Sequence, residues 1–169
     1  MIRIPKNATS PAFIHLDDNI LSLPASSTPP TRVLLAEESL PYRRVIREAL
    51  TSFRHCEVDD SPTAERAFEL ALSRPYHLFI LAIPLPDMSG MMLDRLISKA
   101  YPLTHRGSHT APPVIFLARP EDGNALAAHQ RDVRLRGILS YPPKLDALLS
   151  LTAGLLPEAP GRGSLPPLF

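Results

Sequence analysis

The sequence predicts an α/β protein with a doubly wound, five-stranded parallel sheet and helices on both faces. Short apolar runs without polar alternation recur along the chain, most clearly at 32–36, 78–82 and 114–118. Runs of this length and composition are typical of strands that are buried on both faces, as in parallel sheets. Each run is followed by a segment with apolar residues at helical spacing. Five such alternations with short connections favour the doubly wound arrangement.

The central strand is expected at 78–82, where all five residues are apolar. The chain then turns through Pro84 and Pro86, and Ser89 is a good N-cap for the helix that follows. In doubly wound sheets, ligands bind at the carboxyl ends of the strands. At that end the expected strand has Ala82, whose methyl group can do no chemistry.

The other elements are expected in alternating order along the chain. Further strands are predicted at 32–36, 56–59, 114–118 and 137–141, with the weak strand at 56–59 near an edge of the sheet. Apolar residues at helical spacing predict helices at 42–50, 63–73, 90–100, 122–134 and 145–156.

The chain divides into three parts by composition. Residues 1–31 form an N-terminal extension rich in Pro, Ser and Thr, with apolar stretches at 12–16 and 20–23. These stretches suit either packing on the domain or binding a partner. Residues 32–156 form the folded domain. Residues 157–169 are rich in Pro and Gly, which predicts a disordered tail or a linker.

Composition argues against several classes of protein. The 169 residues carry a net charge of +1, which disfavours a dedicated nucleic-acid or membrane surface. The single cysteine, Cys56, excludes an intramolecular disulfide. No apolar run approaches the roughly 18 residues that span a bilayer, and the N-terminus lacks the order of a signal peptide. We therefore expect a cytoplasmic protein that binds neither nucleic acid nor membrane.

Residues 32–156 resemble the receiver domain of two-component response regulators, which has a flavodoxin-like fold. Residues 33–39 look like its first strand and acidic pair, with Glu37 and Glu38 where the family usually has Asp. Residues 81–90 look like its phosphoacceptor loop, and 114–118 look like its fourth strand. Residues 141–144 look like the end of its fifth strand, with the aromatic position and the lysine.

The resemblance implies a phosphoacceptor pocket that has lost essential parts. Family receivers accept a phosphoryl group from a histidine kinase on an aspartate at the end of the third strand. A divalent metal is held by that aspartate and the acidic pair, and a hydroxyl on the fourth strand and the lysine contact the phosphoryl oxygens. Here the aspartate and hydroxyl positions are both alanine, and a methyl group offers no nucleophile, metal ligand or hydrogen bond. The degenerate pocket comprises Glu37, Glu38, Ala82, Ala118 and Lys144.

Neighbouring residues are not expected to replace the missing groups. Asp87 lies in the following turn and points away from the pocket, and Ser89 is better explained as an N-cap. With no phosphate to bind, Lys144 is expected to pair with Glu37 or Glu38 within about 4 Å. The alternative is a residual metal site, for which these two carboxylates are only weak candidates. We therefore expect no catalytic residue, no resident metal and no cofactor.

The lysine is followed by Leu145, where the family usually has proline and often a cis peptide bond. A cis bond before leucine would cost about 2.5–4 kcal/mol, so we expect this bond to be trans. The six histidines lack the spacing of metal ligands and are expected to be ordinary surface or rim side chains.

The first functional hypothesis is a pseudo-receiver, a receiver-like domain that serves as a protein-interaction module without phosphorylation. In receivers the fourth helix, fifth strand and fifth helix form the face that most often meets partners. Arginine, tyrosine and rigid proline favour binding on such a face. A protein partner or a homodimer is therefore expected there, and the candidate residues are Arg131, Arg134, Tyr141, Pro142 and Pro143.

Three alternatives remain open at this point. The domain could regulate a C-terminal output domain from which it has been severed, such as a nucleotide cyclase, a phosphodiesterase or a DNA-binding domain. The face could be merely solvated, with the N-terminal extension as the interaction site. An enzyme on the same scaffold is disfavoured, because no strand end offers a nucleophile–base pair and no Gly-rich phosphate loop is present.

Overall fold

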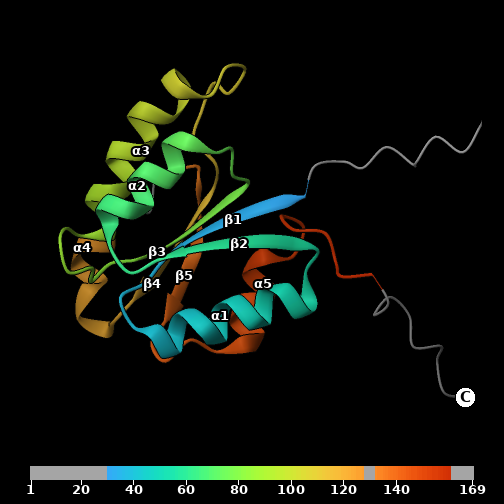
Figure 1. Ribbon diagram of the computed structural model, residues 1–169. Coiled ribbons are helices and arrows are strands. Elements are labelled where there is room, and N and C mark those ends of the chain that lie inside the picture. The colour runs from blue at the N-terminus through green and yellow to red at the C-terminus, as the bar shows by residue number, and fades with distance from the viewer. Residues whose placement is uncertain (1–29, 128–131, 161–169) are drawn as a thin grey trace, which may run out of the picture.

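A computed structural model describes residues 30–127 and 132–160 and confirms the predicted fold class (Figure 1). Its five parallel strands lie in the order β2-β1-β3-β4-β5. The strands are β1 (Thr31–Ala36), β2 (Cys56–Ser61), β3 (Leu78–Ala82), β4 (Val114–Ala118) and β5 (Leu135–Ser140). The strands at 78–82 and 114–118 have the predicted bounds, and β2 is an edge strand as expected.

Helices cover both faces of the sheet. The helices are α1 (Leu40–Phe53), α2 (Ala64–Ser73), α3 (Gly90–Thr104), α4 (Gly123–Ala127) and α5 (Leu145–Thr152), with a 3-10 turn, η1, at Pro120–Asp122. In Figure 1, α1 and α5 lie on one side of the sheet and α2 and α3 on the other. Within the part of the chain that the structure describes, no helix is both long and apolar enough to cross a bilayer.

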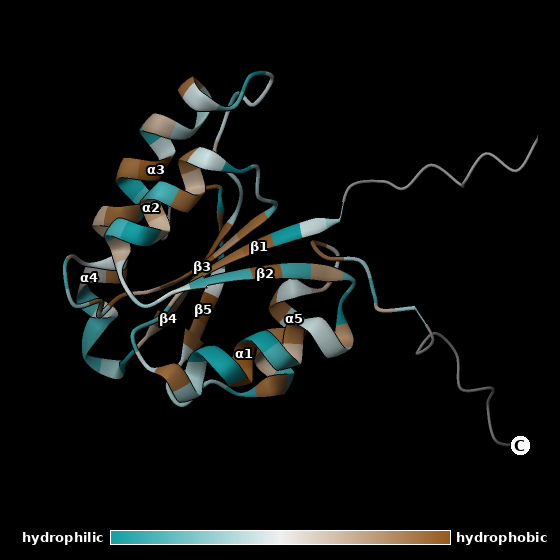
Figure 2. Cartoon of the chain, in the orientation of Figure 1, coloured by the Kyte–Doolittle hydropathy of each residue, from teal (hydrophilic) through white to brown (hydrophobic). Residues whose placement is uncertain are grey.

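Two apolar cores form because successive residues of a strand point to opposite faces. Phe79 and Phe116 pack with α2 and α3, whereas Ile80 and Ile115 pack with α1 and α5. Every residue of β3 and β4 is buried. In Figure 2 the inner strand β3 is accordingly brown, whereas the edge strand β2 is largely teal. The double burial explains why these strands lack polar alternation.

Polar side chains fix the beginnings of α2 and α3. The Ser89 hydroxyl accepts a hydrogen bond from the Met92 N–H at 3.2 Å, which confirms the predicted N-cap. The Asp87 carboxylate accepts hydrogen bonds from the N–H groups of Ala64 and Glu65 at 2.8 and 2.7 Å. Asp87 therefore points away from the strand ends, as the sequence predicted, and caps the beginning of α2.

The fourth helix is shorter than predicted. We expected a helix over 122–134, but α4 ends at Ala127 and residues 128–131 lie outside the described part of the chain. Arg134 lies in the turn before β5, where its backbone N–H donates a hydrogen bond to the Asp132 carboxylate at 2.8 Å. The Val114 N–H donates to the Arg134 carbonyl at 2.9 Å, which brings the chain into the sheet two residues earlier than expected.

Residues following α5 pack against the corner between α1 and β2. The His55 N–H donates to the Pro157 carbonyl at 2.8 Å, and the Ala159 N–H donates to the Phe53 carbonyl at 3.2 Å. Arg54 and Glu158 form an isolated antiparallel bridge. Residues 157–160 are thus attached to the domain, which differs from the disordered tail predicted from 157. The bounds of the predicted domains otherwise remain predictions, and the apolar stretches at 12–16 and 20–23 lie outside the described residues.

Candidate functional site

The candidate site lies where β1, β3, β4 and β5 end. Glu37 follows β1 directly and is buried, with 3 % of its surface exposed. Its Oε1 accepts the backbone N–H of Ser39 at 2.8 Å, and its Oε2 accepts the hydroxyl of Tyr141. Both oxygens of this carboxylate are therefore engaged within the protein.

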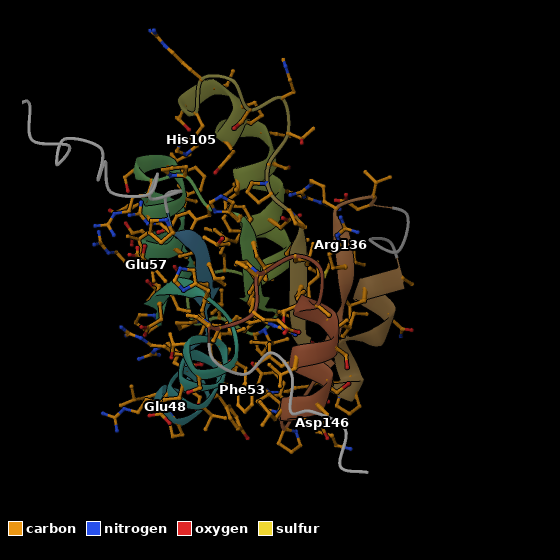
Figure 3. All side chains as sticks on the ribbon, turned by 90° about the vertical axis from the view of Figure 1, so that its right-hand side faces the viewer. Glu48, Phe53, Glu57, His105, Arg136 and Asp146 are labelled. Carbon is orange, nitrogen blue, oxygen red and sulfur yellow. The ribbon has the colours of Figure 1, made fainter. Side chains whose placement is uncertain are left out.

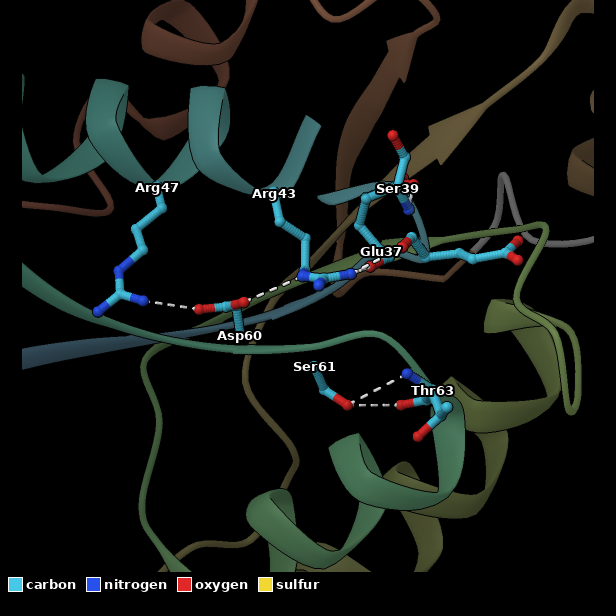
Figure 4. Close-up of polar contacts among 8 residues, drawn as sticks. Glu37, Ser39, Arg43, Arg47, Asp60, Ser61 and Thr63 are labelled. Carbon is cyan, nitrogen blue, oxygen red and sulfur yellow. Dashed lines mark hydrogen bonds and ion pairs between the residues drawn. The ribbon is translucent and has the colours of Figure 1, made fainter. Parts of the chain in front are cut away.

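Arg43 of α1 holds the segment that carries the acidic pair. Its Nη1 donates to the carbonyl oxygens of Glu37 and Glu38, each at 2.7 Å, and its Nε donates to Asp60 of β2 at 3.1 Å. Arg47 donates to the other oxygen of Asp60 at 2.8 Å (Figure 4). These bonds fix the backbone after β1 against β2 and the first turns of α1.

The two alanines lie at the ends of the strands between Glu37 and Tyr141. Ala82 ends β3 and Ala118 ends β4, and both are buried. Glu37 follows β1 and Tyr141 follows β5, so the Tyr141 side chain must cross the ends of β3 and β4 to reach Glu37. Ala82 belongs to the same apolar core against which Tyr141 packs, and its small side chain leaves room for this crossing. The hydrogen bond therefore occupies the region where the resemblance places the aspartate and the hydroxyl.

Tyr141 is held in this orientation by more than one contact. Its ring packs against the ring of Tyr42, with 5.3 Å between the centroids. Its backbone N–H donates to the Ala118 carbonyl at 3.1 Å. Burial and the hydrogen bond to Glu37 raise the pKa of the Tyr141 phenol above its ordinary value. The phenol therefore stays protonated and remains a donor to the carboxylate.

The predicted ion pair of Lys144 is wrong. Lys144 is exposed, and no ion pair joins it to either Glu37 or Glu38. It occupies the N-cap position of α5 and lines a separate hollow with Ile138 and Pro142. The Tyr141 hydroxyl serves as the partner of Glu37 instead.

A cleft of about 450 Å³ opens beside this hydrogen bond. The guanidinium carbon of Arg119 lies 6.0 Å from the centroid of the Tyr141 ring, within the range of a cation–π contact. The cleft thus combines acidic, aromatic and basic groups, and its lining residues are Glu37, Glu38, Ser39, Tyr42, Pro84, Arg119 and Tyr141.

A divalent metal of the kind that the resemblance implies does not fit these residues. Magnesium requires an octahedral set of oxygen ligands. Both oxygens of Glu37 already accept hydrogen bonds, and Ala82 supplies no ligand. Among the described residues, no group of three or more His, Cys, Asp or Glu side chains is placed to hold a metal ion. The expectation that this site has no resident metal remains a prediction.

The structure gives two of the five predicted interface residues, Arg134 and Tyr141, other roles. Arg134 is wrong as a free interface residue, because its Nη2 binds the buried Asp94 of α3 at 2.6 Å and Asp132 at 3.2 Å. Tyr141 is half-buried and directed at Glu37, so its hydroxyl is not available to a partner. Arg131 lies outside the described residues.

The two prolines remain accessible beside α5. Pro142 is exposed and Pro143 is half-buried. Among the described residues the only cis peptide bond joins Tyr141 to Pro142, so the predicted trans bond before Leu145 is confirmed.

Two residues of the cleft were missed in the sequence. Arg119 follows the strand at 114–118 directly, so its position at a strand end was the available signal. Tyr42 was assigned to the inward face of its helix, and the sequence contains nothing to indicate that it meets Tyr141. Their contacts arise because the ends of parallel strands meet at one edge of the sheet.

Comparison with known proteins identifies related sequences and folds. No family model matches the chain. The chain is 27% identical over 135 residues to the response regulator ArlR of Staphylococcus epidermidis, a match that covers 80% of this chain and 57% of that protein. The chain therefore spans little more than half the length of the curated relative it matches.

Solved receiver structures have the same fold. The receiver domain of AraT from Geobacillus stearothermophilus superposes with a TM-score of 0.61 at 20% identity, covering 75% of this chain and 92% of that one. A CheY-like receiver domain protein from Methanospirillum hungatei gives a TM-score of 0.56 at 19% identity, covering 72% and 89%. The chain is therefore similar in sequence to a response regulator and has the fold of solved receiver domains.

Proposed function

We propose that this receiver domain is a pseudo-receiver that acts in two-component signalling as a protein-interaction module independent of phosphorylation. The observation that carries the proposal is the hydrogen bond from Tyr141 to Glu37 across two alanines. The acceptor position is Ala82, so the site lacks the oxygen on which an aspartyl phosphate would form. In this proposal the domain has no catalytic residue, and its cytoplasmic location remains a prediction.

The Tyr141–Glu37 hydrogen bond supports a single conformation of the site. In a receiver that switches, the aromatic residue responds to a phosphoryl group through the hydroxyl on the fourth strand. Ala118 removes that hydroxyl, and the buried carboxylate of Glu37 gives the phenol a permanent acceptor. A hydrogen bond to a charged partner contributes about 1.5–3 kcal/mol. This contribution is large enough to keep the ring inward without any phosphoryl group.

The interaction face proposed for this module consists of β5, the beginning of α5 and the short α4. β5 is an edge strand on which Ile138 is 38 % exposed, and Leu145 at the beginning of α5 is 43 % exposed. Ile138 and the exposed Pro142 line the same hollow. Arg136 is exposed on β5 and projects from the edge of the domain (Figure 3). The partner proposed is a protein, or a second copy, with an apolar strip and acidic groups that face Arg136 and Lys144.

Phosphorylation is tested by incubating the chain with acetyl phosphate and magnesium and measuring its intact mass. The expected result is an unchanged mass under conditions that phosphorylate a receiver with its aspartate present, which is the control for the reagent. A stoichiometric adduct of one phosphoryl group that maps to residues near the cleft would refute the proposal.

The face is tested by sedimentation velocity and by capture of binding proteins, using Ile138→Asp combined with Leu145→Asp. Association by the unmodified chain should be lost in this variant and retained in Leu103→Asp, a matched change at an exposed site on α3. If both variants associate like the unmodified chain, and removal of residues 1–29 abolishes association, the interface lies in the N-terminal extension.

A further inference from the structure

We propose that the cleft beside Tyr141 binds a small alkylammonium ion, and that the guanidinium group of Arg119 occupies this cation position when no ligand is bound. The proposal rests on the same locked pocket as the proposed function, but it requires neither the partner nor the interaction face. In this proposal a ligand binds to the domain at the place where receivers hold a phosphoryl group.

The charge of the cleft favours a cation. Two carboxylates, Glu37 and Glu38, and one cation, Arg119, line it. The Arg43 guanidinium already donates hydrogen bonds to Asp60 and to two backbone carbonyls, so it does not directly neutralise the carboxylates of Glu37 and Glu38. Glu38 is exposed and no side-chain ion pair engages it, which leaves its carboxylate free for a ligand.

The aromatic walls favour an organic cation over a metal ion. The rings of Tyr42 and Tyr141 lie 5.3 Å apart with 50° between their planes, so they form two sides of a corner. Tyrosine faces attract ammonium and guanidinium groups through the quadrupole of the ring. A metal ion would instead need oxygen ligands, and those of Glu37 are already used. Pro84 supplies an apolar surface for the alkyl part of the ligand.

Arg119 shows that this corner accepts a cation. Its guanidinium carbon lies 6.0 Å from the Tyr141 centroid, and the residue is otherwise exposed. An exposed arginine is displaced from such a contact at little cost, because a cation–π contact at an exposed site contributes only about 0.5–1 kcal/mol. A bound ammonium ion would therefore compete with Arg119 for the same ring.

Displacement of Arg119 offers a route by which ligand binding would affect α4. Its backbone N–H donates to the Asp122 carboxylate at 2.8 Å, and Asp122 ends the turn that leads into α4. We therefore expect movement of the Arg119 side chain to alter the beginning of α4. That helix is part of the interaction face proposed above.

The probe is n-butylammonium, added to the 15N-labelled full chain at constant ionic strength, with neutral 1-butanol as the shape-matched control. Saturable shifts are expected at the amides of Ser39 and Tyr42 and at Asp122, with none from 1-butanol. Arg119→Ala should tighten binding by about two- to fivefold because it removes the competing cation. Glu38→Gln should weaken binding by at least a similar factor.

Matched variants distinguish binding at this cleft from a general effect of the protein's charge on the ligand. Glu48→Gln makes the same charge change on α1 at an exposed residue (Figure 3) that does not line the cleft, and it should leave the affinity unchanged. Tyr42→Phe should bind as well as the unmodified chain, whereas Tyr42→Leu should bind more weakly because it lacks an aromatic face. Circular dichroism of each variant verifies that it is folded.

Several results would overturn the proposal. These are equal shifts from 1-butanol, equal losses in Glu38→Gln and Glu48→Gln, weaker binding in Arg119→Ala, or saturation of the same amides by magnesium in preference to butylammonium. The phosphodonor experiment is a separate measurement, so a failure here leaves the proposed independence from phosphorylation standing. A phosphoryl adduct would remove that proposal without deciding whether the cleft binds an amine.

Discussion

The hydroxyl of Tyr141 donates a hydrogen bond to the buried carboxylate of Glu37, from the end of β5 to the end of β1. The two residues are 104 positions apart in sequence, and two strands lie between theirs in the sheet. This contact replaces the ion pair expected of Lys144 and fills the region where a receiver holds its phosphoryl group.

Removing this hydrogen bond should destabilise the domain. Tyr141→Phe keeps the ring and leaves the Glu37 carboxylate with one fewer donor in a buried place, which should cost about 1–3 kcal/mol in the free energy of unfolding. Urea denaturation followed by circular dichroism measures the change. Tyr42→Phe is the control, because the Tyr42 ring also packs in this cluster. Its hydroxyl makes no hydrogen bond to another described residue. Equal stability of Tyr141→Phe and the unmodified chain would contradict this prediction.

The stability of the domain should fall in alkaline solution. The pKa of Tyr141 is raised in the folded state by burial and by the hydrogen bond to Glu37, so the folded state holds its proton more tightly than the unfolded state does. The resulting stabilisation is complete below the ordinary tyrosine pKa of about 10 and is lost as the pH rises above that value. Urea denaturation between about pH 8 and pH 11 should show this fall, and Tyr141→Phe should show a shallower one.

Other groups contribute to the same alkaline fall and remain in both chains of that comparison, among them Tyr101, whose phenol pKa is raised by burial. Burial raises the pKa of the Tyr76 phenol, assisted by its hydrogen bond to Asp59, and burial raises the pKa of the Cys56 thiol to about 11. The difference between the two chains therefore isolates Tyr141. Identical pH slopes for Tyr141→Phe and the unmodified chain would contradict the assignment.

Asp87 should stabilise the domain above acidic pH. Burial alone would raise the pKa of its carboxyl, but hydrogen bonds from the backbone N–H groups of Ala64 and Glu65 outweigh this effect and lower the pKa. The stabilisation is present above the ordinary aspartate pKa of about 4 and is lost as the pH falls through the lowered value. Asp87→Ala removes the cap of α2 and should cost about 0.5–2 kcal/mol at neutral pH. Thermal unfolding at pH 7 and at low pH should show that the cost shrinks in acid.

Gly90 should tolerate no side chain. A Cβ at this position would lie 2.1 Å from the carbonyl oxygen of Ala82, so Gly90→Ala must shift the backbone where β3 ends. We expect a loss of about 2 kcal/mol or more in the free energy of unfolding. Gly123→Ala is the matched control, since no heavy atom lies within 4 Å of its Cβ position and its φ is −57°. The control should be neutral or slightly stabilised, and a similar loss in both variants would refute the steric explanation.

Arg134 should matter for stability more than for binding. Its guanidinium faces the Asp94 carboxylate at 2.6 Å, and Asp94 is 1 % exposed. Arg134→Met removes one partner of a buried ion pair and should cost about 3–5 kcal/mol, as measured by urea denaturation. Arg134→Met combined with Asp94→Leu should recover much of this loss, because the buried carboxylate is then absent as well. A single variant as stable as the unmodified chain would restore Arg134 as a candidate for the interaction face.

The sequence alone determined the fold and what the site cannot do. The unbroken apolar runs at 78–82 and 114–118 define strands buried on both faces, because a half-exposed strand would alternate. Which residue ends each strand is also a local property, so Ala82 and Ala118 could be placed correctly without coordinates. The same holds for Ser89, whose role as an N-cap depends on the turn in which it stands. The cap that Asp87 provides for α2, more than 20 residues earlier in the chain, was not predicted.

Only the tertiary structure decided which groups meet. The sequence paired Lys144 with Glu37 or Glu38, whereas in the structure the partner of Glu37 is the hydroxyl of Tyr141. Arg134 was counted with a helix, yet a buried carboxylate 40 residues away binds it in a turn. Local patterns record burial and period along the chain, whereas these contacts depend on the order of the strands and on the free volume between their ends, which no local pattern contains.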